Sequence, residues 1–129
     1  MGKSISKIHP QKSFNTLFNM DSENTHIYDI LNIGVIIVNR YNVIKYTNIE
    51  CLEIFGYEHI SELLHKNFKD TILIKLNQNS RKKILSKLHI YFNCTQNLRS
   101  KSNVLYMDGR VGFIKYTNIN NNVIMSFYF

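Results

Sequence analysis

The sequence has no tryptophan, no alanine, a single proline and only two cysteines. Cys51 and Cys94 lie far apart in the chain, and they form neither a CxxC pair nor a Cys/His cluster with the spacing of metal ligands. This pattern gives no sign of a metal site and indicates a reducing compartment. Each cysteine is interpreted as a small buried hydrophobic residue.

Long apolar runs and catalytic motifs are also missing. No stretch approaches the roughly 20 apolar residues that a membrane-spanning helix needs, and the N-terminus lacks the apolar region of a secretory signal. There is no Ser/His/Asp constellation, no paired-carboxylate signature and no phosphate-binding loop. We therefore expect a cytoplasmic protein that is not an enzyme.

The sequence does contain enough apolar residues for one folded core. The chain has 129 residues, of which 44% are hydrophobic and 12% aromatic, and a length of roughly 100–150 residues is typical of one domain. Isoleucine, asparagine and lysine are abundant, with 18, 17 and 12 residues. Because their codons are AT-rich, the asparagine content says little about function.

The net charge of +7 is unevenly distributed along the chain. Residues 21–65 carry two basic and seven acidic side chains, whereas residues 66–101 carry nine basic and one acidic. A basic stretch of this kind is typical of a solvated surface, but it also suits an anionic membrane or a nucleic acid. Composition alone leaves these partner classes open.

The pattern divides the chain into a tail and one domain. Residues 1–23 hold the only proline and are interpreted as a flexible tail, and the domain spans 24–129. A short helix is expected over 25–31, and strands over 33–38 and 43–46. The first strand is apolar on both of its alternating faces, so its second face needs a cover, either the N-terminal segment or a partner.

Helices are expected after the second strand. Thr47-Asn-Ile-Glu50 fits a capping box and Gly56 is well placed as the C-terminal cap, which predicts a helix over 48–55. Its expected buried residues are Ile49, Leu52 and Phe55. A short helix over 59–64 follows. A longer helix is expected to open at Ser80, with its basic residues in solvent and an apolar face of Ile84, Leu85, Leu88 and Phe92.

The C-terminal part predicts three antiparallel strands, over 103–107, 110–117 and 123–129. Asp108-Gly109 between apolar strands is a hairpin signal, because both central residues of a type I′ turn need a positive φ. Residues 89–95 fit a strand as well as the end of the long helix. The sequence therefore predicts an α+β fold with a five-stranded antiparallel sheet.

This order of elements resembles the PAS domain family, and the likeness covers residues 26–129. Strand, strand, Asn-led helix and F-G-Y turn follow one another as in that family, in Ile33-Gly-Val-Ile-Ile-Val-Asn39, Val43-Ile-Lys-Tyr-Thr-Asn48 and Ile54-Phe-Gly-Tyr57. The positions that carry the resemblance are Gly34, Asn48, Gly56, Tyr57, Asp108 and Gly109. The PAS resemblance implies short helices inserted after the second strand and one longer helix before the third.

The resemblance also implies a sensor or dimerisation module, and some PAS domains hold haem, flavin or a small ligand between sheet and helices. In the light-sensing flavin subgroup a reactive cysteine follows an asparagine. Here Asn67 matches that asparagine and Phe68 takes the place of the cysteine, so flavin adduct chemistry is not expected. Haem-binding relatives use a histidine on the long helix, where His89 is the match. No cofactor is predicted, and a haem or small-ligand sensor is the alternative.

A second alternative is a nucleic-acid-binding domain. Gly109-Arg-Val-Gly112 matches the GxxG loop that clamps a nucleic-acid backbone in another fold. A β-hairpin needs these glycines anyway, so nucleic acid is the weaker interpretation of the basic face.

The N-terminus Met1-Gly-Lys-Ser-Ile-Ser6 fits the motif for N-myristoylation at Gly2. One myristoyl chain gives only marginal membrane binding, so a second signal is needed. Lys3, Lys7 and Lys12 would supply it as charge, at up to ~1 kcal/mol each near anionic lipid. We expect peripheral attachment to the cytoplasmic face of a membrane.

The sequence thus predicts a non-enzymatic, membrane-tethered PAS-type sensor or protein-interaction module. Since the last strand runs to Phe129, the output is expected in trans, through a protein partner or a homodimer. The doubly apolar first strand favours an interface on the sheet, and so does a set of aromatic residues. That set is Tyr106, Phe113, Tyr116, Phe127 and Phe129.

Overall fold

The computed structural model describes residues 32–129. The strands are β1 (Gly34–Asn39), β2 (Ile44–Thr47), β3 (Arg99–Leu105), β4 (Val111–Ile119) and β5 (Asn122–Tyr128). Between β2 and β3 lie α3 (Ile49–Phe55), α4 (Phe68–Thr71), α5 (Gln78–Phe92) and the 3₁₀ turns η1 (Ile60–Glu62) and η2 (Leu73–Lys75). The predicted tail, the helix over 25–31, and Gly2, Lys3, Lys7 and Lys12 lie outside the described residues.

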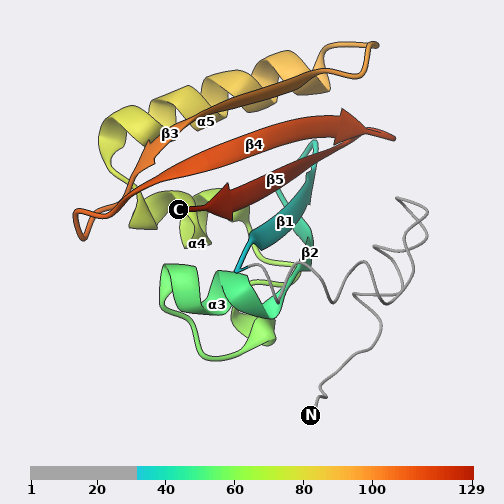
Figure 1. The fold of residues 1–129 in the computed structure, drawn as a ribbon. Helices are drawn as coiled ribbons and strands as arrows, with labels where there is room; N and C mark the ends of the chain where they lie inside the picture. The colour runs from blue at the N-terminus through green and yellow to red at the C-terminus, as the bar shows by residue number, and fades with distance from the viewer. Residues whose placement is uncertain (1–31) are drawn as a thin grey trace.

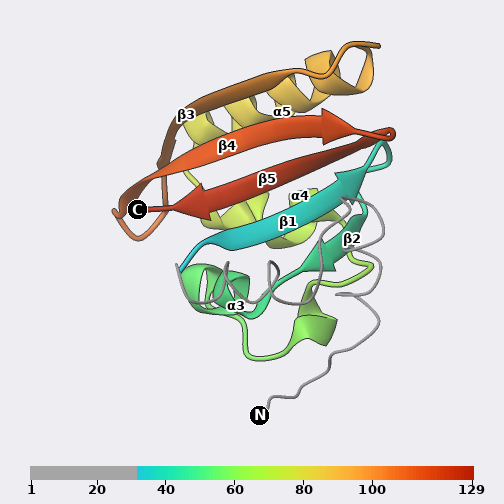
Figure 2. The same cartoon turned by 45° about the vertical axis from the view of Figure 1, so that its right-hand side comes forward.

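The five strands form one antiparallel sheet in the order β2-β1-β5-β4-β3, so the first and last strands of the chain pair at its centre. Figures 1 and 2 show α4 and α5 on the same face of this sheet, with α3 beside the start of β1. The predicted α+β fold, with its helices inserted between the second and third strands, is confirmed.

Two hairpin turns are built alike. Asn42 in the β1–β2 turn and Gly109 in the β3–β4 turn have positive φ angles of 64° and 95°. Each turn is closed by a backbone hydrogen bond across three loop residues, from Asn39 N–H to the Val43 oxygen at 3.1 Å and from Tyr106 N–H to the Arg110 oxygen at 2.9 Å. This is the three-residue loop with one left-handed residue.

The hairpin at Asp108-Gly109 is therefore confirmed, but its predicted type I′ geometry is wrong. Asp108 is not among the residues with positive φ, because the pairing of Leu105 with Val111 leaves a loop too long for a two-residue turn. Two consecutive positive φ angles occur instead at Asn120 and Asn121, in the turn between β4 and β5.

The start of α3 differs from the prediction. Its N-cap is Asn48, whose Oδ1 accepts from the Cys51 N–H at 3.3 Å, whereas Thr47 is the buried last residue of β2. Gly56 ends the helix at φ 79°, as predicted. Ile49 is 49% exposed, so its predicted burial is wrong. The buried residues of α3 are Cys51, Leu52, Ile54 and Phe55.

The long helix α5 opens two residues earlier than predicted and ends at Phe92, so only residues 89–92 of the stretch that also fitted a strand are helical. Asn77 is its N-cap, with Oδ1 accepting from the Ser80 N–H at 2.9 Å. Ser80 itself is buried, and its Oγ accepts from the Leu105 N–H of β3. The core-facing residues are Ile84, Leu88 and Tyr91, while Leu85 is 36% exposed.

The core has two parts. The larger cluster lies between the sheet and its helices and includes Ile36 and Val38 of β1. The smaller one gathers Val35, Ile37 and Tyr46, with Val35 and Ile37 only 1% exposed. Burial on both faces of β1 confirms what its doubly apolar sequence predicted.

Candidate functional site

Aromatic side chains fill the space between the sheet and its helices. Phe68, at the start of α4, is fully buried. Phe55 of α3 meets Phe127 of β5 edge-on, with ring centroids 5.0 Å apart. Tyr91 of α5 meets Tyr116 of β4 at 5.8 Å. A haem or flavin in this compartment would have to displace these rings.

Two tyrosine hydroxyl groups are buried in the compartment. Tyr106 and Tyr116 are 2% and 1% exposed, and neither hydroxyl makes a regular hydrogen bond within residues 32–129. Burial raises the pKa of both side chains, that of Tyr116 to about 12, with the nearby Ser102 hydroxyl opposing the shift. Both tyrosines are therefore neutral at neutral pH and serve mainly as apolar filling.

His89 does not face this compartment. It is exposed on α5 and lines an open pocket of about 520 Å³, shared with Leu85, Arg40 and Lys69. Its Nδ1 lies 3.4 Å from the side-chain nitrogen of Asn93. An axial haem ligand needs an enclosed apolar compartment beside its free ring nitrogen, so the surroundings of His89 do not fit haem. Within residues 32–129 no cluster of His, Cys, Asp and Glu has the arrangement of a metal site.

The residues that carry the PAS resemblance hold the fold together. Asn48 Oδ1 accepts from the Val35 N–H at 3.0 Å and its Nδ2 donates to the Ile33 oxygen at 2.8 Å, which ties α3 to β1. A Cβ on Gly34 would come within 2.9 Å of the Cys51 Sγ, so only glycine allows this close approach.

Tyr57 acts in a similar structural way at the end of α3. Its hydroxyl donates to the Thr71 oxygen of α4 at 2.7 Å, and the Lys75 Nζ lies 4.8 Å from the centre of its ring. Burial raises the pKa of the Tyr57 hydroxyl, with Glu62 adding to the shift, so it is a neutral donor.

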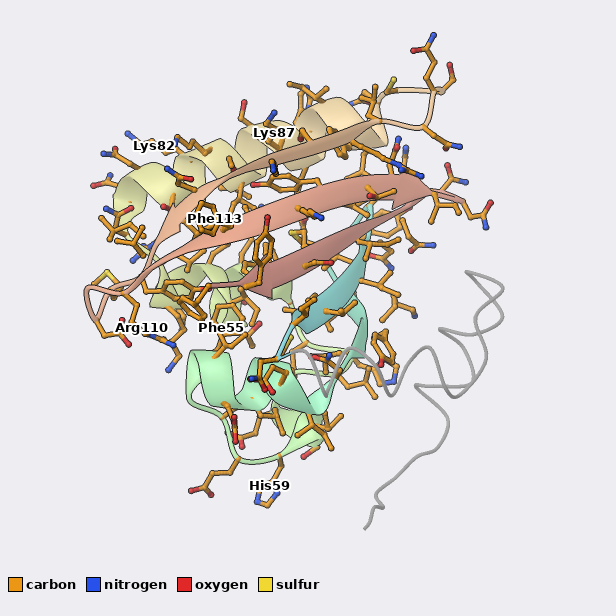
Figure 3. The ribbon with its side chains drawn as sticks, in the orientation of Figure 1. Phe55, His59, Lys82, Lys87, Arg110 and Phe113 are labelled. Carbon is orange, nitrogen blue, oxygen red and sulfur yellow. The ribbon has the colours of Figure 1, made fainter. Side chains whose placement is uncertain are left out.

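The face of β3 and β4 that points away from the helices is exposed and carries apolar and basic side chains. Phe113, labelled on β4 in Figure 3, is 43% exposed and stacks on Tyr128 with ring centroids 5.5 Å apart. Val111 beside it is 61% exposed. We call this surface the outer strip; its residues are Arg99, Lys101, Leu105, Val111, Phe113, Lys115 and Tyr128.

The charge of the outer strip is entirely positive. Lys101 and Lys115 are direct partners across β3 and β4, and like charges in such positions repel. The Lys115 Nζ lies 5.8 Å from the centre of the Tyr128 ring. The strands β3, β4 and β5 contain no acidic residue that would neutralise these groups.

The aromatic residues that were expected at an interface fall into a buried group and an exposed group. Tyr106, Tyr116 and Phe127 are buried in the main core. Phe113 and Phe129 are exposed, and Phe129 lies against the Tyr106 ring at 5.3 Å. An interface on the sheet can therefore use only part of the set.

No protein-family model matches the chain, and no curated protein matches its sequence. Solved structures match its fold. The photoactive yellow protein domain of the sensor histidine kinase Ppr from Rhodospirillum centenum has a TM-score of 0.61 at 14% identity, covering 88% of this chain and 97% of that one. The PAS domain of the Cronobacter turicensis quorum-sensing receptor RpfR, in complex with BDSF, has a TM-score of 0.58 at 14% identity, covering 75% and 92%. The PAS domain of an HTR-like protein from Haloarcula marismortui has a TM-score of 0.53 at 13% identity, covering 81% of this chain and 95% of that one. The chain has the PAS fold.

Within this PAS fold the compartment between sheet and helices is occupied by the chain's own aromatic rings, whereas two other surfaces are accessible. These are the outer strip and the pocket beside His89. The sequence had already pointed to Phe113 and His89. It did not point to Arg40 and Lys69, which are 29 positions apart and line the same pocket only in the folded chain. None of the helices in residues 32–129 is long and apolar enough to cross a membrane.

Proposed function

We propose that this PAS domain is a non-enzymatic sensor or interaction module that acts in trans, by binding an acidic partner protein through the outer strip. The observation that carries the proposal is the stack of the exposed Phe113 on the half-buried Tyr128, set beside basic side chains of two neighbouring strands. An aromatic centre with a charged surround is the usual composition of a protein interface.

The lysine pair supports an acidic partner in particular. Lys101 and Lys115 repel each other in the free domain, and a carboxylate placed between them would relieve that repulsion. Complementary charge also speeds association and suppresses wrong partners. A partner surface with Asp or Glu around an apolar patch therefore fits the strip.

A second copy of the chain fits less well. In a symmetric dimer the same patch meets itself, which would bring the positive side chains of one outer strip against those of the other. Since β3, β4 and β5 supply no carboxylate for cross-pairing, a homodimer through this face would leave the charges unpaired.

The partner proposal predicts that charge reversal on the strip weakens binding at least tenfold. The variant is Lys101→Glu/Lys115→Glu. Its matched control is Lys82→Glu/Lys83→Glu, which changes the net charge equally; both control residues are exposed on α5, and Lys82 is labelled in Figure 3. Proteins captured from the source cells by the wild-type chain would be identified, purified and titrated against all three chains. The control should bind within about twofold of wild type, because it lies outside the strip.

Two results would contradict the partner proposal. Equal weakening by the strip variant and the control would mean that binding follows net charge rather than the strip. A concentration-dependent dimer in sedimentation velocity that the strip variant abolishes would assign the strip to a second copy. Circular dichroism of each variant would confirm that folding is retained.

We further propose that the module is held at a membrane through Gly2. The support is the N-terminal motif together with Lys3, Lys7 and Lys12. Co-expression with N-myristoyltransferase should add one myristoyl group to the intact mass and make the protein sediment with anionic vesicles. Gly2→Ala should abolish both effects, because the motif requires glycine as the residue whose amine is acylated. An unmodified wild-type chain would remove the tether but leave the partner proposal standing.

A further inference from the structure

A second accessible site lies at the other end of α5 from its N-cap. The pocket of about 520 Å³ opens between the C-terminal half of α5, the start of α4 and the β1–β2 turn. Its volume falls within the roughly 300–1,000 Å³ of typical small-molecule sites. It lies outside the main core, although Leu88 forms part of both.

The pocket combines an apolar wall with cationic groups. Leu85, Leu88 and Phe92 supply the wall from one side of α5. Arg40 and Lys69 reach the same pocket from the β1–β2 turn and from α4, and no Asp or Glu lines it. The salt bridge found within residues 32–129 joins Arg110 to Asp108, so neither pocket cation has an acidic partner there.

The cation from the turn is held in place before any ligand arrives. The Arg40 Nη2 donates to the Phe92 oxygen at the end of α5, at 2.8 Å. The turn that carries Arg40 is fixed by Asn39, whose Oδ1 accepts from the N–H groups of Tyr41 and Val43 at 2.9 and 3.0 Å. A guanidinium has five N–H groups, so Arg40 keeps donors for a ligand.

The backbone carbonyl oxygens at the end of α5 are already engaged. The last turn of α5 would otherwise present free carbonyl oxygens to a ligand. Instead, the Asn93 Nδ2 donates to the His89 oxygen at 2.8 Å, and the Asn93 N–H donates to the Ile90 oxygen. These carbonyl oxygens are therefore not free to repel a ligand anion, and Arg40 and Lys69 supply donors beside the apolar wall.

From this arrangement we propose that the pocket binds a small carboxylate with a short aliphatic chain. The carboxylate lies between Arg40 and Lys69, and the chain lies along Leu85, Leu88 and Phe92. A charge-assisted hydrogen bond from a guanidinium is stronger than a neutral one, which selects the acid over the corresponding alcohol. The site is separate from the outer strip, because none of the residues that line it belongs to that strip.

The probe for this site is octanoate, with octanol and inorganic phosphate as the two half-ligands. Titration of the ¹⁵N-labelled chain should give saturable shifts of the backbone amides of Arg40, Lys69 and Asn93 with octanoate. Octanol and phosphate should each bind at least tenfold more weakly, because each lacks one half of the recognised chemistry. Arg40→Gln and Lys69→Gln should each weaken octanoate binding about tenfold, whereas Lys82→Gln should leave it unchanged.

Three outcomes would overturn the pocket proposal. Equal binding of octanol would show that the cations are not used, and equal binding of phosphate would show that the apolar wall is not used. Shifts confined to Tyr106 and Tyr116 would place octanoate in the main core instead. The structural hydrogen bond of Lys69 runs from its backbone N–H to the Asn67 Oδ1, and glutamine keeps it. Because the Lys69 side chain is exposed, Lys69→Gln decides the question even if Arg40→Gln is unstable.

Discussion

Replacing Asn48 with alanine should lower the free energy of unfolding by about 3 kcal/mol and the melting temperature by about 15 °C. Asn48 is 4% exposed and sits between β1 and α3. Its Oδ1 accepts from the Val35 and Cys51 N–H groups, and its Nδ2 donates to the Ile33 oxygen at 2.8 Å. Alanine leaves these buried groups without their side-chain partner.

The size of the Asn48 effect is set by the cost of leaving backbone groups without a hydrogen-bond partner, which is larger than the net contribution of the hydrogen bonds to stability. A buried donor or acceptor that loses its partner costs about 1–3 kcal/mol, and here at least the Val35 N–H and the Ile33 oxygen lose theirs. The Cys51 N–H keeps a weak backbone contact with the Asn48 oxygen at 3.2 Å, so it adds less.

Urea denaturation would measure the loss, with Asn79→Ala as the control. Asn79 is exposed in the first turn of α5, and its substitution should change the free energy of unfolding by less than about 0.5 kcal/mol. Asn48→Asp is a sharper probe, because it keeps the acceptor and removes the donor to Ile33. A loss below 1 kcal/mol for Asn48→Ala would show that water or a backbone shift replaces the side chain.

The sequence predicted the sheet well because its strands follow local rules. The alternation of apolar residues in a strand, and the glycine of the β3–β4 turn, can each be recognised within a short stretch of sequence. Helix boundaries were predicted less accurately, because the first residue of a helix depends on which of two adjacent polar side chains caps its N–H groups. Thr47 and Asn48 are both good caps by composition, and the pairing of Thr47 with Ile36 in the sheet decides between them.

The accessible surfaces were harder to predict because they depend on contacts across the fold. Phe113 and Tyr116 lie three positions apart, so strand alternation places them on opposite faces, but only the packing of the helices decides that Tyr116 is the buried one. The meeting of Arg40 with Lys69 depends on the placement of α4 against the β1–β2 turn, through the bond from the Phe68 N–H to the Asn42 oxygen at 2.7 Å. No local pattern in the sequence places these two side chains at one pocket.

Phe68 is the residue whose truncation should cost most. Phe68 is fully buried in the main core. Phe68→Ala removes a ring from a closely packed interior, which costs about 3–5 kcal/mol. Since small domains are stable by only about 5–15 kcal/mol in total, this variant should be only marginally folded at 37 °C.

The same variant tests whether the Phe68 ring fills interior space that a small ligand could otherwise occupy. If the Phe68 ring occupies that space, Phe68→Ala opens an apolar cavity that should bind a small apolar molecule such as benzene. Saturating benzene should then raise the melting temperature of Phe68→Ala, because a ligand that binds only the folded state stabilises it. Phe68→Leu is the matched control, since it conserves most of the volume, should lose less than about 1.5 kcal/mol and should not respond to benzene. A destabilised Phe68→Ala chain that benzene leaves unchanged would mean that the neighbouring side chains collapse into the space, and that the compartment is closed by the packing of the whole core rather than by one ring.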